Sequence, residues 1–393
     1  MYRAVSVPSR LTRTLVHSAR SSHIRPSLLS LYAFAISTTL QKRSITTASS
    51  AQEPLTSTRI EESAVKGTEG PHYADTTGAV TTRAPVDDSY IQGIGDWVLY
   101  RPVYTQEELK AVQPTVHHRE VTLSDKMASG LVRLARKMFD LVSGYKHKPL
   151  PLGTNMTVEE LRKEGYVMTE AGWMNRCMFL ETIAGIPGMV AATVRHLHSL
   201  RLLRRDAGWI HTLLEEAENE RMHLMSFLAI RKPGIFMRAL ILGAQGVFYN
   251  LFFFSYLVSP RVCHRFVGYL EEEAVKTYTA LISDLENGRF PEWADQPAPE
   301  IAKDYWRLPD DAKRLDMIYA IRSDEVSHRF VNHSLANLKM NDVNPFAFRE
   351  PDMTVKGIKY GFERDEAAQY VRESLEIVKE NSSEESARST KNT

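Results

Sequence analysis

The pattern Glu-x-x-His occurs twice in the sequence, at Glu220 and His223 and again at Glu325 and His328. Both copies lie in stretches of helical character. On a helix, residues three apart lie on one face and can bind a common ion. One copy alone would be weak evidence, because chance often supplies it. Two copies on separate helices favour a metal-binding helical bundle, which needs two such motifs and one Glu from each of two further helices.

Glu181 is the candidate on the first of those further helices. It is the only acidic residue between Glu170 and Asp206, and it lies in the otherwise apolar run 178–183. Burying a carboxylate there is costly unless it is paired or binds a metal ion. The alternative is a Glu that faces solvent.

The second further helix offers three consecutive carboxylates, Glu271, Glu272 and Glu273. We expect Glu271 to point inward, because helical spacing places it on the same side as an apolar set. Glu272 and Glu273 are expected to hydrogen-bond a ligand from outside or to face solvent. The apolar set comprises Val267, Leu270, Ala274, Tyr278 and Leu281.

The six candidate ligands are four carboxylates and two imidazoles, a set that suits iron or manganese better than a thiolate-binding metal. Asn219 and Asp324 each directly precede a candidate Glu. They are expected to hydrogen-bond the ligands, unless they face solvent. The other histidines in the helical region lack a Glu at the required offset in an apolar context. We expect structural or surface positions for His196, His198, His211, His264 and His333.

Helical periodicity predicts an all-α protein, and strands have little support. Residues 239–260 contain no charge and have Arg238 and Arg261 on either side. Their length suits a membrane span, but a helix in the membrane interface or a buried helix fits equally well. The other predicted helices cover 126–142, 169–198, 208–230, 261–287 and 310–338.

The helix predicted at 126–142 is amphipathic, and its polar face is basic. This pattern indicates either a helix on a membrane surface or an ordinary surface helix on a soluble core. The apolar residues are Met127, Leu131, Leu134, Met138 and Leu141, and the basic ones are Lys126, Arg133, Arg136 and Lys137.

Residues 1–52 carry seven Lys or Arg and no Asp or Glu, and they are rich in Ser. This composition is typical of a mitochondrial transit peptide, although a chloroplast signal or a disordered basic arm shares it. We expect cleavage between Arg43 and about residue 65. Removing these seven charges from a net charge of +1 leaves about −6 on the remainder. The near-neutral whole argues against nucleic acid as a partner.

Cys177 and Cys263 are the two cysteines of the sequence. Two cysteines exclude a disulfide scaffold and a structural zinc cluster of the cysteine type.

At the candidate ligands the sequence resembles the mitochondrial alternative oxidases, a family of cyanide-insensitive ubiquinol oxidases. The blocks that carry the resemblance are 180–190, 213–224, 270–279 and 322–333. The resemblance implies a ferritin-like four-helix di-iron bundle with two additional amphipathic or apolar membrane-associated helices. It also implies that two iron ions are held by Glu181, Glu220, His223, Glu271, Glu325 and His328.

The resemblance further implies the activity and its setting. Such an enzyme oxidises ubiquinol and reduces O2 to water without pumping protons, which bypasses the cytochrome pathway. It is a homodimer bound to the lipid of the inner mitochondrial membrane from the matrix side. On that precedent, the helices at 126–142 and 239–260 lie on the membrane and do not span it.

Tyr278 matches the tyrosine near the metals in this family and is a candidate redox or proton-coupled residue. The alternative is a buried tyrosine that hydrogen-bonds a ligand. Tyr305 and Trp306 form a further aromatic pair. The family's quinone-binding positions match Arg176, Cys177, Leu180, Ala274 and Thr277.

The sequence departs from the plant members, which carry regulatory cysteines in the N-terminal arm, because no cysteine precedes Cys177. It looks more like the fungal members. We divide the chain into a transit peptide and linker (1–64), an N-terminal arm (65–125), a di-iron catalytic domain (126–340) and a C-terminal tail (341–393), with a charged and mobile end.

Other di-iron proteins are the rival predictions. A plastid quinol oxidase would call for plastid targeting, and a hydroxylase of quinone biosynthesis is usually much shorter. A ferritin-like iron store is disfavoured by the apolar segment 239–260 and by the basic amphipathic helix.

Overall fold

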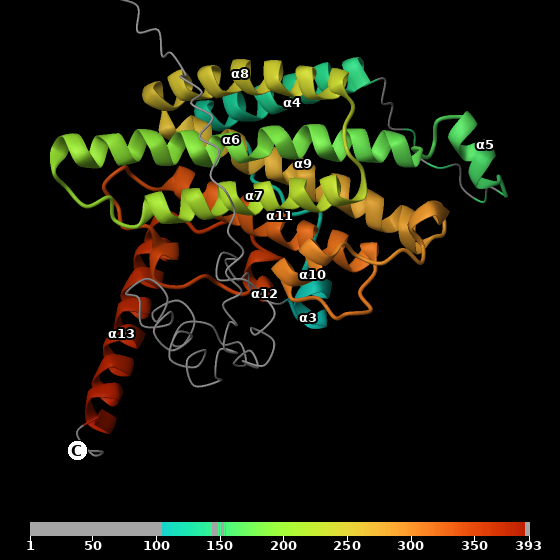
Figure 1. The fold of residues 1–393 in the computed structure, drawn as a ribbon. Helices are drawn as coiled ribbons and strands as arrows, with labels where there is room; N and C mark the ends of the chain where they lie inside the picture. Colours follow the sequence, from blue (N-terminus) through green and yellow to red (C-terminus); the bar gives the residue numbers. More distant parts are fainter. Residues whose placement is uncertain (1–103, 144–147, 149, 151–152, 154, 390–393) are drawn as a thin grey trace, which may run out of the picture. The chain divides into compact units, whose positions relative to one another are not determined.

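Four long helices hold all six candidate ligands: α6 (Glu170–Leu202), α7 (Trp209–Ile230), α9 (Pro260–Glu286) and α11 (Arg314–Asn337). α6 packs mainly against α7, and α9 packs mainly against α11. Figure 1 shows these helices running alongside one another. The predicted all-helical bundle is therefore confirmed. Within the described residues, the only β-type pairing is an isolated bridge between Pro297 and Lys313.

The computed structural model describes residues 104–143, 148, 150, 153 and 155–389. All of them belong to one unit of the chain, Ser57–Thr393. The predicted transit peptide, its cleavage site and the first part of the predicted arm lie outside the described residues. So do the last four residues of the charged tail.

The bundle helices begin where local hydrogen bonding favours them. The hydroxyl of Thr169 accepts a hydrogen bond from the backbone N–H of Gly172 and so caps α6. Ser259 caps α9, whose first residue is Pro260. α11 begins at Arg314, four residues after the predicted start, where the backbone N–H of Lys313 donates a hydrogen bond to Oδ2 of Asp316.

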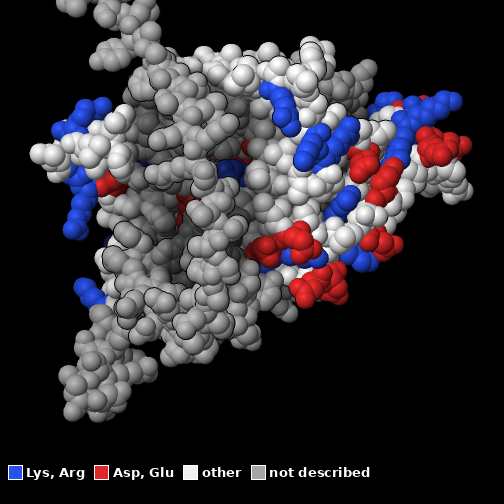
Figure 2. Space-filling view, in the orientation of Figure 1, with Lys and Arg blue, Asp and Glu red and all other residues white. Residues whose placement is uncertain are grey.

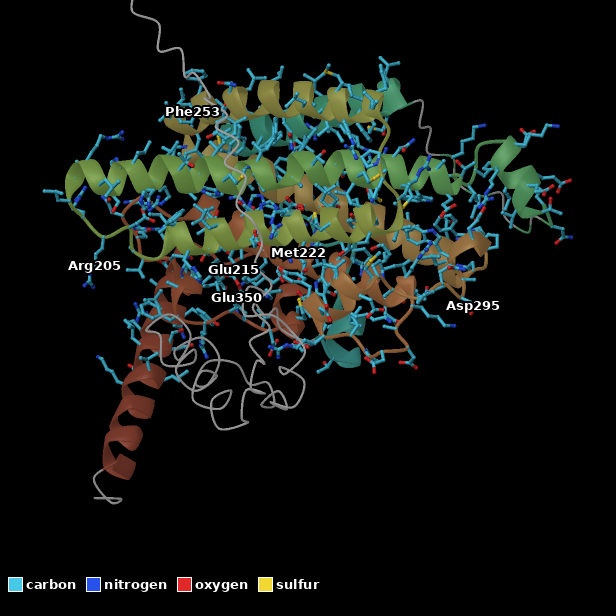
Figure 3. The ribbon with its side chains drawn as sticks, in the orientation of Figure 1. Arg205, Glu215, Met222, Phe253, Asp295 and Glu350 are labelled. Carbon is cyan, nitrogen blue, oxygen red and sulfur yellow. The ribbon has the colours of Figure 1, made fainter. Side chains whose placement is uncertain are left out.

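Two apolar clusters surround the candidate ligands along the bundle. One contains Met178, Met222 and Ile321, and the other contains Ile186 and Phe330. The candidate ligands occupy the positions between these clusters on α6 and α11. In Figure 3, Met222 lies within the bundle, whereas Arg205 and Asp295 mark its two ends. The polar layer is therefore enclosed by apolar packing on both sides.

Glycine brings the helices of each pair close together. A Cβ on Gly188 of α6 would lie 2.5 Å from the carbonyl oxygen of Leu213 on α7. A Cβ on Gly268 of α9 would lie 2.6 Å from Nδ1 of His333 on α11. Contacts this short exclude any larger side chain without a shift of the helices.

Helix α4 (Leu123–Ser143) packs against α9 with its apolar stripe turned outward. Its inward contacts are made by Ala128 and Val132, which pack with Tyr269. The five apolar residues of the predicted stripe are 49–83% exposed: Met127, Leu131, Leu134, Met138 and Leu141. An ordinary surface helix turns such a stripe toward the core. The helix is thus amphipathic as predicted, but its apolar face does not pack on the protein.

Helix α8 (Ile235–Val258) lies against α6 and α9 and leaves most of its apolar side chains exposed. Only Phe252 and Tyr256 are buried. Phe266 of α9 packs beside both α4 and α8, so the two helices flank the same side of the bundle. They lie along the upper edge in Figure 1, and Phe253 labels α8 in Figure 3. In Figure 2, the part of this edge that is drawn in colour or white carries few charged residues.

Two described helices, α6 and α8, are long and apolar enough to cross a membrane by length and composition. α6 passes this test as a core helix, since half of its apolar window is buried and it carries Glu181 into the bundle. α8 is different, because only 11% of its window is buried.

The remaining helices are shorter or terminal, and the sequence did not predict them. The charged tail forms α13 (Arg364–Ser389), and Phe346 and Phe362 from the segment after residue 340 pack with Phe330 in the core. The others are α3 (Gln106–Ala111), α5 (Val158–Lys163), α10 (Glu300–Trp306), α12 (Met353–Lys356) and the 3-10 turns η2 (Pro291–Trp293) and η3 (Pro345–Ala347).

Candidate metal centre

The six predicted ligands lie together in the middle of the bundle, and each is at most 5% exposed. They form two overlapping groups whose potential ligand atoms lie within 4.8 Å of one another. Glu220 and Glu325 belong to both groups. One group adds Glu181 and His223, and the other adds Glu271 and His328.

The imidazole nitrogens of His223 and His328 lie close to carboxylate oxygens of neighbouring candidate ligands. Nδ1 of His328 is 2.7 Å from Oε1 of Glu220. Nδ1 of His223 is 3.3 Å from Oε2 of Glu181 and 3.4 Å from Oε1 of Glu325. Each imidazole therefore presents the same ring nitrogen to the shared space between the helices.

Several buried ligand atoms have no hydrogen-bond partner of normal geometry. They are Oε2 of Glu181, both carboxylate oxygens of Glu220, Nδ1 of His223, Oε2 of Glu325 and both ring nitrogens of His328. Unpaired buried polar atoms are rare, because each one loses the hydrogen bonds that it would make to water. Here they converge from three helices, α6, α7 and α11. A pair of metal ions bound by carboxylates and imidazoles fits this donor set.

Burial and mutual repulsion set the charges of the metal-free cluster. Burial raises the pKa of Glu181 to about 8. Burial, together with the neighbouring Glu325 and Glu220, raises the pKa of Glu271 well above its ordinary value. Burial alone would lower the pKa of His328, but the carboxylate of Glu220 raises it to about 10. Without metal, protons on the imidazoles and on some carboxyls offset the crowded negative charge.

Asp324 fixes the orientation of His223. Its Oδ2 lies 3.1 Å from Nε2 of His223, and accepts hydrogen bonds from Nδ2 of Asn219 at 2.7 Å and Nε1 of Trp306 at 2.8 Å. Its Oδ1 accepts a hydrogen bond from the hydroxyl of Tyr104. A carboxylate in this position holds the Nε2–H of the histidine and leaves Nδ1 for the metal. Asn219 and Asp324 are both buried and do not face solvent.

The predicted aromatic pair lies beside the same network. The hydroxyl of Tyr305 accepts a hydrogen bond from Nδ2 of Asn219 at 3.0 Å. The ring of Trp306 stacks on His223 with centroids 5.8 Å apart. Tyr305 therefore restricts the movement of Asn219, and Trp306 restricts the movement of the His223 ring.

Tyr278 is buried on α9, and its hydroxyl donates a hydrogen bond to Oε1 of Glu181. Its ring stacks on Phe227, with centroids 6.4 Å apart. Burial and the adjacent carboxylate of Glu181 raise the pKa of this phenol well above its ordinary value. Tyr278 therefore keeps its proton beside the cluster at neutral pH.

The predicted quinone-binding residues lie on α6 and α9. Arg176 is buried, and its Nη1 donates to Oδ1 of Asp140 on α4 at 3.2 Å. The Thr277 hydroxyl donates to the backbone carbonyl of Glu273 at 2.8 Å. Cys177 is buried and reduced. Leu180 and Ala274 are partly exposed.

Glu272 and Glu273 make their contacts away from the six candidate ligands. Oε1 of Glu272 lies 2.9 Å from Nε2 of His333, and the side chain is buried. Glu273 pairs with Arg136 and with Lys276 near the surface. The buried pairing of Glu272 with His333 was not predicted.

The histidines outside the cluster occupy structural or surface positions, as predicted. Nδ1 of His264 lies 3.1 Å from Oδ1 of Asn332, and its Nε2 lies 3.0 Å from the hydroxyl of Tyr256. His333 is buried beside Glu272, whereas His196, His198 and His211 are exposed.

Two residues near the cluster escaped the sequence analysis. Glu216 is buried on α7 and accepts a hydrogen bond from Nδ2 of Asn332 at 2.7 Å, and burial raises its pKa to about 7. Glu216 precedes Glu220 by one helical turn and so lies on the same helix face, a comparison that could have identified it from the sequence. Tyr104 offered no such signal, because its contact with Asp324 depends on where the chain before α3 lies.

Known proteins resemble this chain over most of its helical part. The sequence profile of the alternative oxidase family matches residues 104–337. The mitochondrial alternative oxidase of Cryptococcus neoformans var. grubii is 52% identical over 313 residues, which cover 78% of this chain and 76% of the relative. That of Emericella nidulans is 55% identical over 276 residues, or 67% of this chain and 75% of the relative. That of Ajellomyces capsulatus is 50% identical over 291 residues, covering 71% and 79%.

Metal uptake by the metal-free protein is expected to release protons at neutral pH. His328, with its pKa raised to about 10, holds a proton below that pH, and its imidazole binds metal only after losing it. The apparent affinity for Fe(II) should therefore rise from about pH 6 to about pH 8. Anaerobic titration in weak buffer with a pH indicator measures the protons, and protein already loaded with metal is the control. An affinity independent of pH would contradict the expectation.

Proposed function

The chain belongs to the alternative oxidase family, and we propose that its six clustered side chains bind the two irons of this oxidase. The protein is a mitochondrial ubiquinol oxidase that reduces O2 at a di-iron site. The observation that carries the ligand assignment is the pair of overlapping carboxylate–histidine groups, buried in a chain about half identical to such oxidases.

The overlap of the two groups suggests how the ligands divide. Glu181 and His223 would bind one iron, and Glu271 and His328 the other. Glu220 and Glu325 belong to both groups and would be shared between the ions. Asp324 holds the outer nitrogen of His223, which orients the imidazole before metal arrives.

The bound irons supply the electron transfer from quinol to O2. The protein contributes position, a dry environment and protons. The apolar clusters on either side of the ligands keep water away from them. We propose that Tyr278 takes part as a proton-coupled residue, because its raised pKa keeps a proton beside Glu181.

We propose that the quinol ring binds beside α4, at Arg176, Cys177, Leu180, Ala274 and Thr277. Arg176 already contacts Asp140 on α4, which connects the lipid-facing helix with the ligand helix α6. Leu180 and Glu181 are adjacent on α6, so a ring at this position would lie next to the metal ligands.

The outward apolar faces of α4 and α8 support attachment to one face of the inner mitochondrial membrane. α8 lies alongside α6, with Nε2 of Gln245 donating to the carbonyl of Thr182 at 2.8 Å. If α8 stood across the bilayer, the bundle helices beside it would bring their charged surfaces into the hydrocarbon. α8 and α4 therefore fit a position in the plane of the membrane, and the basic leader favours the matrix side.

The exposed apolar surface of α6 and α7 supports a homodimer. Soluble monomers rarely expose apolar patches beyond a few hundred Å². These two helices pack together, and both leave large apolar side chains exposed. We propose that a second copy of the chain covers them by a two-fold contact. The exposed apolar residues that we assign to this contact include Met189, Leu197, Leu200 and Leu214.

We retain the division of the chain into transit peptide and linker, arm, catalytic domain (126–340) and tail as a proposal. The helices that carry all six proposed ligands lie within the catalytic segment.

Replacing a shared ligand should remove both metal ions and the activity. For Glu220→Ala we expect loss of both irons and a fall of more than about 100-fold in quinol oxidation, since even groups behind the ligands contribute about 10–100-fold. Membranes that contain the full chain are assayed for cyanide-resistant O2 uptake with ubiquinol, and iron is measured on purified protein. Glu215→Ala, on the exposed side of the same helix, is the matched control. Full iron content and uptake in Glu220→Ala would overturn the assignment.

Removal of the phenolic hydroxyl of Tyr278 should lower the rate of quinol oxidation without loss of bound iron. Tyr278→Phe is expected to keep its iron and to lose about 10²–10⁴-fold in kcat, the range of positioned proton donors. Tyr319→Phe, near the surface and bonded to Glu286, is the control. An unchanged kcat in Tyr278→Phe would leave the residue with a packing function only.

Charges on the outward face of α4 should release the protein from lipid. The double variant Leu134→Glu and Met138→Glu is expected to lose co-flotation with vesicles, because a buried carboxylate is costly, while its iron content stays constant. Val343→Glu changes an exposed apolar residue elsewhere and should leave flotation unaltered. If the double variant floats with vesicles to the same extent as the native chain, membrane attachment through α4 is contradicted.

Charges on the exposed face of α6 should prevent association. Leu197→Glu combined with Leu200→Glu is expected to give a monomer in detergent, measured by light scattering during size-exclusion chromatography. Ile358→Glu, at an exposed apolar residue outside these helices, should remain dimeric. A dimeric double variant would exclude this face as the contact.

A further inference from the structure

A cavity of about 670 Å³ lies under the link between α7 and α8. Its walls include Met178 of α6, Leu224 and Leu228 of α7, and Ile241 of α8, and they are mainly apolar. In Figure 1 the link rises past α6 from the end of α7 to the start of α8. The volume is within the range of about 300–1,000 Å³ typical of small-molecule sites.

This cavity does not coincide with the proposed quinol position. It is lined by Met178 and Thr182, whereas the quinol position uses Arg176 and Leu180. Residues two apart on a helix differ by about 200° in direction. The two sites therefore occupy opposite sides of α6, and the proposed quinol position does not account for the cavity.

Cationic side chains line the cavity where the link joins α8. Lys232 and Arg238 both contribute to the lining. Arg238 is anchored by its Nε, which donates to the carbonyl of Pro233 at 3.2 Å. The carboxylate of Glu300, which also lines the cavity, is paired with Nζ of Lys303 at 2.9 Å. Within the described part of the chain, Lys232 forms no ion pair.

The same rim adjoins the most exposed part of the apolar helix. Ile235 and Phe236, at the start of α8, are 88% and 85% exposed. Under the proposed membrane attachment these side chains enter lipid, which places Lys232 and Arg238 at the level of the lipid headgroups. A neutral quinol carries no charge that would pair with Lys232 and Arg238. An anion with a hydrocarbon tail matches both these cations at the rim and the apolar walls.

We propose that this cavity binds an acyl chain of an acidic phospholipid whose phosphate is held by Lys232 and Arg238. The proposal rests on the membrane attachment proposed for α4 and α8. The bound lipid would fix the α7–α8 link and so set how α8 sits on the membrane.

The test uses the purified full-length protein with its iron, freed of lipid in detergent. Short-chain phosphatidic acid is titrated, and binding is followed by the rise in the temperature of unfolding. We expect saturable binding at least about tenfold tighter than for phosphatidylcholine of the same chain length, a ratio that corresponds to about 1.4 kcal/mol.

Two variants locate the site. Lys232→Gln with Arg238→Gln should abolish the preference for phosphatidic acid, and Leu228→Trp should weaken binding by filling the apolar space without changing charge. Arg204→Gln with Arg205→Gln removes two exposed cations at the α6–α7 turn and should retain the preference. Equal loss in this control pair would show unspecific attraction and overturn the site.

Three further outcomes would also overturn the proposal. Equal binding of inorganic phosphate alone would assign the rim to a free anion. Equal binding of phosphatidylcholine would assign the cavity to hydrocarbon without charge selection. Displacement of the lipid by ubiquinol would assign it to the substrate.

Flotation with neutral vesicles separates this inference from the proposed function. If the native protein floats with phosphatidylcholine vesicles but shows no preference for phosphatidic acid, only the lipid site fails. If it does not float, the membrane attachment on which the site rests has failed.

Discussion

The cost of burying four carboxylates is the constraint on which the rest of the structure depends. Glu220 and Glu325 lie in both ligand groups, among side chains that are almost fully enclosed. Such crowding is stable only with compensating positive charge, supplied by protons in the metal-free chain and by iron in the oxidase. Apolar clusters enclose this polar layer on both sides. Asp324, which accepts hydrogen bonds from three other side chains, holds His223 in place.

Tight helix pairing and an unpaired outer surface coexist in this fold. Gly188 and Gly268 allow the bundle helices to approach so closely that the ligands of different helices meet. α4 and α8, in contrast, add little to the core and expose their apolar side chains. The inner part of the molecule is thus specified by packing and charge, and the outer part by the environment that the protein enters.

The sequence predicted the bundle and the six clustered residues because both follow from local spacing. Glu271 was found by the helix face that it shares with apolar neighbours, and that geometry is the same in any helix. Glu181 was found as the only acid in an apolar run, where a carboxylate is costly to bury. The side toward which α4 turns was not predictable, because spacing defines a stripe but not its partner. Tyr104 was missed because its bond to Asp324 joins segments 220 positions apart. The helix α13 was missed because its residues show weak apolar periodicity.

The outward stripe of α4 has a consequence for how the protein reaches its final state. A chain that completes its bundle in water still presents five large apolar side chains of α4 to the solvent. Such surfaces associate with one another at the concentrations of a cellular compartment. Under the proposed membrane attachment, the bilayer acts as the last folding partner. The time between bundle formation and contact with lipid is then the period in which the protein is open to aggregation and to capture by chaperones.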